Sequence, residues 1–341
     1  MPRRDGCHAE RVAGRHYRAP APPGIVEVMT NSTDTTPRPA VTHDPRDGSD
    51  VVISTSGLTC RYGDFTAVGG VDLTVRRGEL YALLGTNGAG KTTTLEVLEG
   101  HRVADGGAVE VLGGDPTDRS RTRRRLGMML QDSGLAPELT VRESVLLTGA
   151  ISGRDDDVDR VLGLVGIDHK ARSRVAQLSG GERRRVDFAA AVWGTPELVF
   201  LDEPTTGLDP AARDALWDVV TELREAGVTF VLTTHYLEEA ADNADRIGLM
   251  HAGTIRREGT VADLTAGSTT SIRFVAPGPL DELPLRVART ENDLVVVETD
   301  SPQRDLTRLM TWAAEADRRL ERLTVHQSGL DEVFRELSRA S

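Results

Sequence analysis

The chain has 341 residues, 38% apolar and 4% aromatic, which is enough for one large α/β domain and a smaller unit. Its 53 acidic and 41 basic residues give a net charge of −12, which argues against a broad nucleic-acid-binding surface and predicts no nucleic-acid partner. Two cysteines make no disulfide framework, and no secretory signal or apolar run of about 18 residues is visible, so we expect a cytoplasmic protein with at most a peripheral membrane role.

Residues 1–50 are rich in Pro, Arg, Thr and Asp and show no helical or strand periodicity. This composition predicts a disordered tail. The stretch before Met29 has the character of translated upstream sequence, so Met29 is as good a candidate for the translation start as Met1.

From Val51 the pattern changes to short β-type runs, VVISTSGLTC and AVGGVDLTV, which are joined by RYGDFT. These runs predict an antiparallel flap beside a nucleotide-binding core. Tyr62 stands in the predicted connecting loop, where its ring can stack on an adenine base. Alternatively, the tyrosine only covers the flap.

The stretch GTNGAGKTT follows an apolar run and precedes a helical pattern, and it fits the phosphate-loop pattern G-x-x-x-x-G-K-[ST]. Its glycines allow positive φ and let backbone N–H groups curl around phosphate oxygens at the positive end of a helix. We expect Lys91 to reach the β- and γ-phosphates, Thr92 to ligate Mg²⁺ and Thr93 to support the α- and β-phosphates. The expected nucleotide contacts are Gly85, Thr86, Asn87, Gly88, Ala89, Gly90, Lys91, Thr92 and Thr93.

The alternative is a glycine-rich turn that binds nothing. Only two of the 41 basic residues are lysines, Lys91 and Lys170, so the chain uses arginine almost wherever a cation is needed. A lysine in the loop is therefore informative, because a compact ammonium fits between phosphates where a planar guanidinium does not.

The run RSRTRRRLGMMLQD predicts a basic helix and then a short strand that ends at Gln131. The amide of Gln131 can ligate Mg²⁺ or hold a water, but an ordinary loop glutamine is an equal alternative. Residues 137–195 then form a predicted helical insertion, with helical spacing in ELTVRESVLLTGAI and in DDDVDRVLGLVGI.

The insertion closes with LSGGERRRVDFAAAVW. Ser179, Gly180 and Gly181 are expected to cap its helix, whose free N–H groups make a second anion site. Two anion-binding helix starts in one chain need either two ligands or one shared ligand.

The apolar run ELVFLDEP predicts a strand buried on both faces of a parallel sheet. Its two carboxylates, Asp202 and Glu203, should point to opposite sides, so that Asp202 holds the Mg²⁺ shell while Glu203 faces an attacking water. A second buried strand, VTFVLTTH, ends at His235, which we expect to sense the γ-phosphate. A histidine considered alone is more often a cap or a core residue.

Residues 267–341 predict a second, small α/β unit in which no chemistry stands out. It is either a regulatory or docking domain or only a stabilising cover.

Taken together, residues 51–266 resemble the ATP-binding subunit of an ABC transporter. The motifs occur in family order: the loop at 85–92, Gln131, LSGGE, LVFLDEP, GLD at 207–209 and His235. The resemblance implies an α/β phosphate-loop NTPase core with an antiparallel flap and a helical insertion, ATP and Mg²⁺ as ligands, and Asp209 as a further nucleotide contact. It also implies a homodimer in the ATP-bound state, in which LSGG of one copy contacts the γ-phosphate held by the other.

The C-terminal part resembles the extension of the daunorubicin-resistance type of drug-export ATPase, whose chains end in a phrase similar to GLDEVFREL. This implies an ATPase that drives export of a drug, antibiotic or lipid-like cargo through a separate membrane permease, at the inner face of the cell membrane. The chain departs from the commonest family pattern at Glu182, often glutamine, and at Met129 and Leu130. The latter two leave the surface that receives the permease undefined.

The main alternative is a mechanical ATPase not coupled to transport. Such proteins place a long coiled coil between the two motifs, whereas here only residues 94–177 separate them and no heptads run through these residues. A small-molecule kinase would explain the phosphate loop but would leave LSGG without a role.

Overall fold

The computed structural model describes residues 50–266, 270–327 and 329–339. All of them belong to one compact unit, Arg46–Ser341. The disordered tail predicted over residues 1–50 lies outside the described residues except for its last residue, and the predicted domain boundaries stay predictions.

A six-stranded sheet forms the centre of the nucleotide-binding part, in the order β5-β6-β7-β3-β8-β9. The first five strands are parallel, and β9 is antiparallel to β8. Successive residues of β3 face opposite sides: Leu80 and Leu84 pack into one buried cluster, whereas Tyr81 and Leu83 pack into another. The strands are β3 Leu80–Gly85, β5 Leu126–Met129, β6 Leu198–Asp202, β7 Thr229–Thr234, β8 Arg246–His251 and β9 Thr254–Gly259.

The predicted antiparallel flap is present as a three-stranded sheet in the order β2-β1-β4. Its strands are β1 Val51–Tyr62, β2 Phe65–Arg76 and β4 Gly106–Val111. Tyr62 was expected in the connecting loop, but it is the last residue of β1 and pairs with Phe65 of β2. The turn is therefore shorter than predicted, which fixes the position of the Tyr62 backbone.

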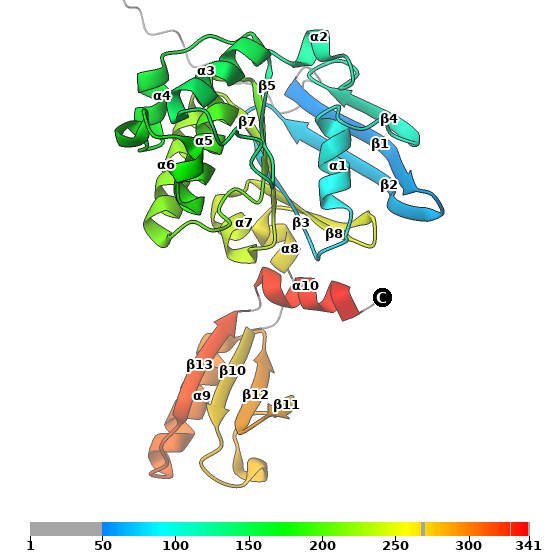
Figure 1. Cartoon of the computed structure of the whole chain (residues 1–341). Helices are drawn as coiled ribbons and strands as arrows, with labels where there is room; N and C mark the ends of the chain where they lie inside the picture. The colour runs from blue at the N-terminus through cyan, green and yellow to red at the C-terminus, as the bar shows by residue number, and fades with distance from the viewer. Residues whose placement is uncertain (1–49, 267–269, 328, 340–341) are drawn as a thin grey trace, which may run out of the picture. The chain divides into compact units, whose positions relative to one another are not determined.

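Helices cover both faces of the central sheet, with α3 to α6 on one side and α1 with the flap on the other (Figure 1). They are α1 Lys91–Leu98, α2 Arg119–Thr122, α3 Val141–Ser152, α4 Val158–Leu164, α5 Gly180–Val192, α6 Pro210–Glu225, α7 Leu237–Asn243 and α8 Val261–Thr265. The predicted basic helix is only the four residues of α2, and β5 ends at Met129, two residues before Gln131. Gln131 therefore lies in a loop rather than in a strand.

The C-terminal part has its own antiparallel sheet, in the order β11-β12-β10-β13, and its own apolar core around Phe274 and Leu309. Its elements are β10 Thr270–Val275, β11 Arg289–Glu291, β12 Leu294–Thr299, α9 Pro302–Glu315, β13 Glu321–Gln327 and α10 Leu330–Arg339. Helix α10 belongs to a different cluster, because Leu330 and Val333 are buried with residues of β3 and α7. None of the described helices is long and apolar enough to cross a membrane.

Candidate nucleotide-binding and catalytic site

The phosphate loop connects β3 to α1, and glycines are required where other backbone comes close. A Cβ atom on Gly85 would lie 2.5 Å from the carbonyl oxygen of Met250, and one on Gly90 would lie 2.5 Å from that of Ala67. Gly90 also has a φ of +102°, a conformation that L side chains rarely adopt. Helix α1 begins at the next residue, so its free N–H groups open into the loop.

Lys91 lies inside the loop. Its Nζ donates hydrogen bonds to the carbonyl oxygens of Gly85, at 2.7 Å, and Thr86, at 3.2 Å. Burial lowers the pKa of Lys91, and the negative charges of Glu203 and Asp202 oppose this shift. The loop thus holds a cation that is only 7% exposed and has an unused N–H donor.

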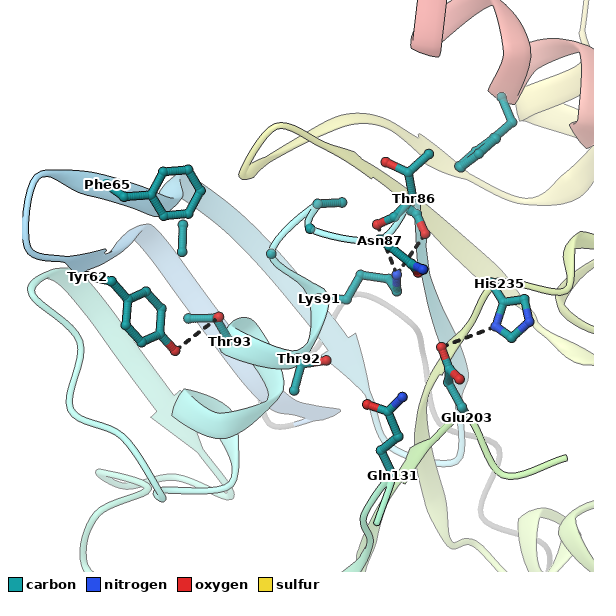
Figure 2. Close-up of a pocket in the computed structure, with 16 residues that line it drawn as sticks. Tyr62, Phe65, Thr86, Asn87, Lys91, Thr92, Thr93, Gln131, Glu203 and His235 are labelled. Carbon is teal, nitrogen blue, oxygen red and sulfur yellow. Dashed lines mark hydrogen bonds and ion pairs between the residues drawn. The ribbon is translucent and has the colours of Figure 1, made fainter. Parts of the chain in front are cut away.

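A cavity of about 870 Å³ opens over the loop, which is the size of a small-ligand site. Figure 2 shows Tyr62 and Phe65 on one side of the loop, Glu203 and His235 on the other, and Lys91 between them. The cavity therefore brings together nucleotide contacts and catalytic candidates from distant parts of the sequence. It is lined by Tyr62, Phe65, Ala67, Gly85, Thr86, Asn87, Gly88, Ala89, Gly90, Lys91, Thr92, Thr93, Gln131, Glu203, His235 and Phe334.

The Tyr62 ring lies at one end of this cavity. Its hydroxyl is 3.4 Å from both Thr93 Oγ1 and Glu96 Oε2. The guanidinium carbon of Arg102 lies 4.1 Å from the ring centroid, so a cation covers one face of the ring. An aromatic base can therefore stack only on the other face.

Glu203 and His235 meet at the opposite end. His235 Nδ1 lies 3.2 Å from Glu203 Oε1, and the Thr206 hydroxyl donates to Glu203 Oε2 at 3.4 Å. Glu203 was expected to continue the strand and to point away from Asp202 by simple alternation. It instead follows the last residue of β6 and has a φ of +49°. The backbone therefore leaves the strand here, and strand alternation does not set its direction.

Asp202 lies behind the cavity rather than on its wall. The residue is 6% exposed, and its carboxylate accepts a hydrogen bond from the Thr233 hydroxyl. Burial raises the pKa of Asp202, and the bond from Thr233 opposes that shift. Thr92 and Gln131 line the cavity and offer oxygen atoms. No group of three or more His, Cys, Asp or Glu residues that could hold a metal occurs in the described ranges.

The LSGGE motif begins α5 in the expected way. Ser179 Oγ accepts from the Glu182 N–H at 3.2 Å, and Glu182 Oε2 accepts from the Ser179 N–H at 2.8 Å, which is a reciprocal capping box. Gly180 is exposed, and Gly181 lies beside the loop that leads to Asp209, the N-cap of α6. Among the described residues of this chain, the cavity wall includes the phosphate loop but not Ser179, Gly180, Gly181 or Asp209.

Comparison with known proteins gives the family. A family model described as ABC transporter matches residues 68–206, and a model described as the C-terminal domain of ABC transporter domain-containing protein-like proteins matches residues 270–328. The chain is 37% identical over 305 residues to the daunorubicin resistance ATP-binding protein DrrA3 of Streptomyces coeruleorubidus, covering 85% of this chain and 96% of that protein. The chain belongs to the ABC transporter family.

Other relatives of this ABC protein agree. It is 40% identical over 205 residues to the Nod factor export ATP-binding protein I of Burkholderia lata, covering 58% of this chain and 67% of that protein. A solved ATP-binding subunit of an ABC transporter superposes with a TM-score of 0.60 at 29% identity, covering 63% of this chain and 92% of that one. A dimeric cassette bound to ADP and Pi superposes with a TM-score of 0.57 at 25% identity, covering 61% and 98%. The chain is an ATP-binding and ATP-hydrolysing subunit that powers an ABC-type exporter.

Two aromatic residues of the ABC ATPase cavity were missed from the sequence. Phe65 is 63% exposed and follows the Gly63–Asp64 turn, which Tyr62 precedes. Two aromatic residues that flank a two-residue turn were therefore an available signal. Phe334 comes from α10, a segment to which we assigned no chemistry. Nothing local in the sequence indicates that α10 packs beside the nucleotide cavity.

Proposed function

We propose that this ABC ATPase drives export of an antibiotic-like or lipid-like cargo through a separately encoded permease at the inner face of the cell membrane. Two copies of the chain hydrolyse Mg·ATP between them. The relatives named for daunorubicin resistance and Nod factor export support this cargo class. The observation that carries the hydrolytic mechanism is that one cavity joins Lys91, Gln131 and Glu203.

The loop binds the phosphates of ATP. Backbone N–H groups of the loop and of the first turn of α1 donate to phosphate oxygens, and Lys91 turns its unused donor toward them. The hydroxyl of Thr92 and the amide oxygen of Gln131 are hard oxygen ligands that fit Mg²⁺, with Asp202 behind them. Since Mg²⁺ is usually held by few protein groups plus phosphate and water, this sparse donor set is sufficient. When bound, the ion neutralises phosphate charge.

Glu203 accepts a hydrogen bond from the attacking water and polarises it. His235 and Thr206 hold the two carboxylate oxygens at 3.2 Å and 3.4 Å, which restricts the rotation of the side chain. The imidazole of His235 also lines the cavity, where it contacts the γ-phosphate.

The second anion site requires a second copy of the chain. The N-terminus of α5 presents exposed Ser179 and Gly180 away from the cavity wall of its own chain. A symmetric head-to-tail dimer lets this helix start complete the partner's site, twice, with no binding surface left over. Asp209 lies on the loop beside Gly181 and therefore approaches the same interface.

A second cavity, of about 300 Å³, receives the permease. It lies between β5 and α3, and its wall includes Met128, Met129 and Leu130, just before Gln131. Leu130 is 44% exposed and Ile151 is 61% exposed, so this groove offers apolar surface to a cytoplasmic helix of the membrane subunit. Because Leu130 of the groove directly precedes Gln131 in the sequence, movement of that helix would displace Gln131.

The test uses Glu203→Gln, which keeps the shape of the side chain but removes its charge. Hydrolysis should fall by about 100-fold or more, Mg·ATP should still bind, and light scattering should show an ATP-dependent dimer. Adding Ser179→Arg places bulk at the partner's γ-phosphate and should return the protein to monomer. Ser179→Ala is the matched control, because it removes the same helix cap without adding bulk.

Each result bears on a different part of the proposal. Normal turnover by Glu203→Gln would show that another group activates the water. A Glu203→Gln protein that binds ATP without hydrolysing it, yet stays monomeric at high concentration with and without the permease, would overturn the shared site. Equal loss of the dimer in Ser179→Arg and Ser179→Ala would mean that loss of the Ser179 hydroxyl, rather than added bulk at the γ-phosphate, disrupts assembly.

A further inference from the structure

Arg184, on α5, is a buried cation whose hydrogen bonds all go to backbone carbonyls. The side chain is 7% exposed. Nε donates to the carbonyl oxygen of Pro204 at 3.2 Å; Nη1 donates to those of Leu130 and Gln131 at 2.6 and 3.1 Å; Nη2 donates to those of Asp202 and Glu203 at 2.5 and 2.7 Å. A guanidinium has five N–H donors, so every one of them is used on the backbone.

These carbonyls lie where two neighbouring strands stop pairing. The parallel ladder between β5 and β6 ends at the pair Met129 and Leu201. The candidate site residues Gln131 and Glu203 come soon after this pair, where the β5–β6 ladder no longer connects the two segments. Arg184 connects the two segments instead. Its guanidinium donates to two carbonyls just after β5, those of Leu130 and Gln131, and to the three carbonyls of residues 202–204 at the end of β6.

Glu203 needs such support more than most residues. Its φ of +49° lies in the left-handed region, which is unfavourable for a residue with a Cβ, and Pro204 restricts its backbone further. A conformation of this kind persists only where surrounding contacts hold it in place. The carbonyls of Asp202, Glu203 and Pro204 are all fixed by one guanidinium, while the Glu203 N–H is fixed by the Thr233 carbonyl at 3.0 Å.

We propose that Arg184 is a positioning residue for ATP hydrolysis, which holds the backbone of Glu203 against the Leu130–Gln131 segment in the geometry that water activation requires. This inference rests on the proposed role of Glu203. Arg184 itself does not line the nucleotide cavity formed by the described residues. It acts through the backbone, and it lies five residues after Ser179 on the same helix. A displacement of α5 at the shared site would therefore be transmitted to Glu203.

The experiment compares Arg184→Lys with Arg185→Lys in the full-length protein. Lysine keeps the positive charge but has three donors, so it can satisfy at most three of the five carbonyls. Arg185, the next residue of α5, is the matched control, because its guanidinium donates to the carbonyl of Gly166 at 3.0 Å and not to the segments after β5 and β6. Displacement of a catalytic group by about 1 Å costs on the order of 100-fold in rate, so Arg184→Lys should lower kcat by about 30- to 100-fold. The Kd for Mg·ATP should change by less than about threefold, since no phosphate contact is lost.

A purely structural role predicts a different outcome. It would lower the melting temperature and the folded fraction, while kcat per ATP-binding site stayed normal. Both variants are therefore assayed per titrated site, and normal kcat in Arg184→Lys overturns the proposal. Should Arg184→Lys not fold, Arg184→Gln is measured in the same way, and failure of both to fold assigns Arg184 to stability alone.

A mutant cycle with Glu203→Gln separates this inference from the proposed function. If Arg184 acts by positioning Glu203, single-turnover hydrolysis by the double variant should be within about threefold of Glu203→Gln alone, because the group being positioned is already disabled. Rate losses that multiply would show that Arg184 acts elsewhere and would overturn the inference. Normal hydrolysis by Glu203→Gln alone would instead refute the proposed role of Glu203.

Discussion

Replacement of Lys91 by methionine is expected to weaken Mg·ATP binding by roughly 150-fold without unfolding the protein. The side chain is nearly isosteric, but it lacks the ammonium that lies inside the phosphate loop. Because the Lys91 ammonium donates to the carbonyls of Gly85 and Thr86, the loop loses these two hydrogen bonds as well as the charge.

The magnitude follows from how the three donors of the ammonium are used. Two donate to loop carbonyls, so one is free for a phosphate oxygen, and a hydrogen bond to a charged group is worth about 1.5–3 kcal/mol. A second phosphate contact must replace a carbonyl contact, so it adds only about 1 kcal/mol. The sum is about 3 kcal/mol, and since each 1.4 kcal/mol is tenfold in affinity, the Kd should rise by roughly 150-fold.

The assay is calorimetric titration with Mg·ATP, together with thermal melting. Lys170→Met is the matched control, because Lys170 is the only other lysine and its ammonium lies 3.1 Å from Glu182, outside the phosphate loop. It should leave the Kd within about twofold, because Lys170 does not line the nucleotide cavity formed by the described residues. Lys91→Arg should also bind poorly, because a planar guanidinium does not fit between phosphates. An unchanged Kd in a cooperatively melting Lys91→Met protein would refute the phosphate-loop assignment.

Three further predictions concern the same site and its surroundings. Burial lowers the pKa of Lys91, and the negative charge of bound phosphate should raise it again. ATP affinity should therefore fall as the pH rises above the pKa of Lys91 in the nucleotide-free protein. Calorimetry in buffers of different ionisation enthalpy should show proton uptake on binding, and Lys91→Met should remove this uptake. Tyr62→Ala should weaken ATP binding by about 5- to 150-fold through lost stacking. Tyr62→Phe should bind within about twofold, because the tyrosine hydroxyl that it lacks makes only a long contact, 3.4 Å, to Thr93. Equal losses of affinity in the two variants would exclude stacking. Val333 of α10 is buried, so Val333→Asp should lower the free energy of unfolding, measured in urea, by about 1.5–3 kcal/mol. Val325→Asp is the control, because Val325 is 45% exposed and its replacement should leave this free energy unchanged. Equal effects of the two substitutions would mean that α10 does not stabilise the nucleotide-binding part.

Much of the fold could be predicted because its signals are local. Continuous apolar runs that end in polar residues identify β3, β6 and β7 as strands of a parallel sheet, since both faces of those strands are buried. The pairing of β1 with β4 could not be predicted, because the sequence between them includes the phosphate loop and no pattern marks strands as partners at that distance. The direction of Glu203 could not be predicted either, because its positive φ depends on contacts from α5 and β7.

Arg184 shows why part of the site cannot be found from spacing. Three consecutive arginines stand at 183–185, and helical periodicity does not single out the middle one. Arg184 precedes the buried Phe188 and Ala191 by four and seven residues, but Arg185 precedes the buried Ala189 and Val192 by the same intervals. What distinguishes Arg184 is the set of five carbonyls around it, and these come from two other segments of the chain.

The departure from the family pattern at Glu182 has a structural explanation. A side-chain oxygen of either glutamine or glutamate can accept a hydrogen bond from the N–H of the N-cap residue, so the capping box with Ser179 does not require a charge at position 182. Glutamate also attracts Lys170, and the Ser179 N–H bond together with Lys170 lowers the pKa of Glu182 to about 2. A carboxyl group whose pKa is lowered by folding stabilises the protein at any pH above its ordinary pKa, and this stabilisation is lost only as the pH falls through the lowered pKa. The start of α5 therefore stays capped and Glu182 stays charged throughout the neutral range. The two lysines of this arginine-rich chain thus have different roles: Lys91 supplies a positive charge inside the phosphate loop, whereas Lys170 pairs with Glu182 and supports the cap of α5.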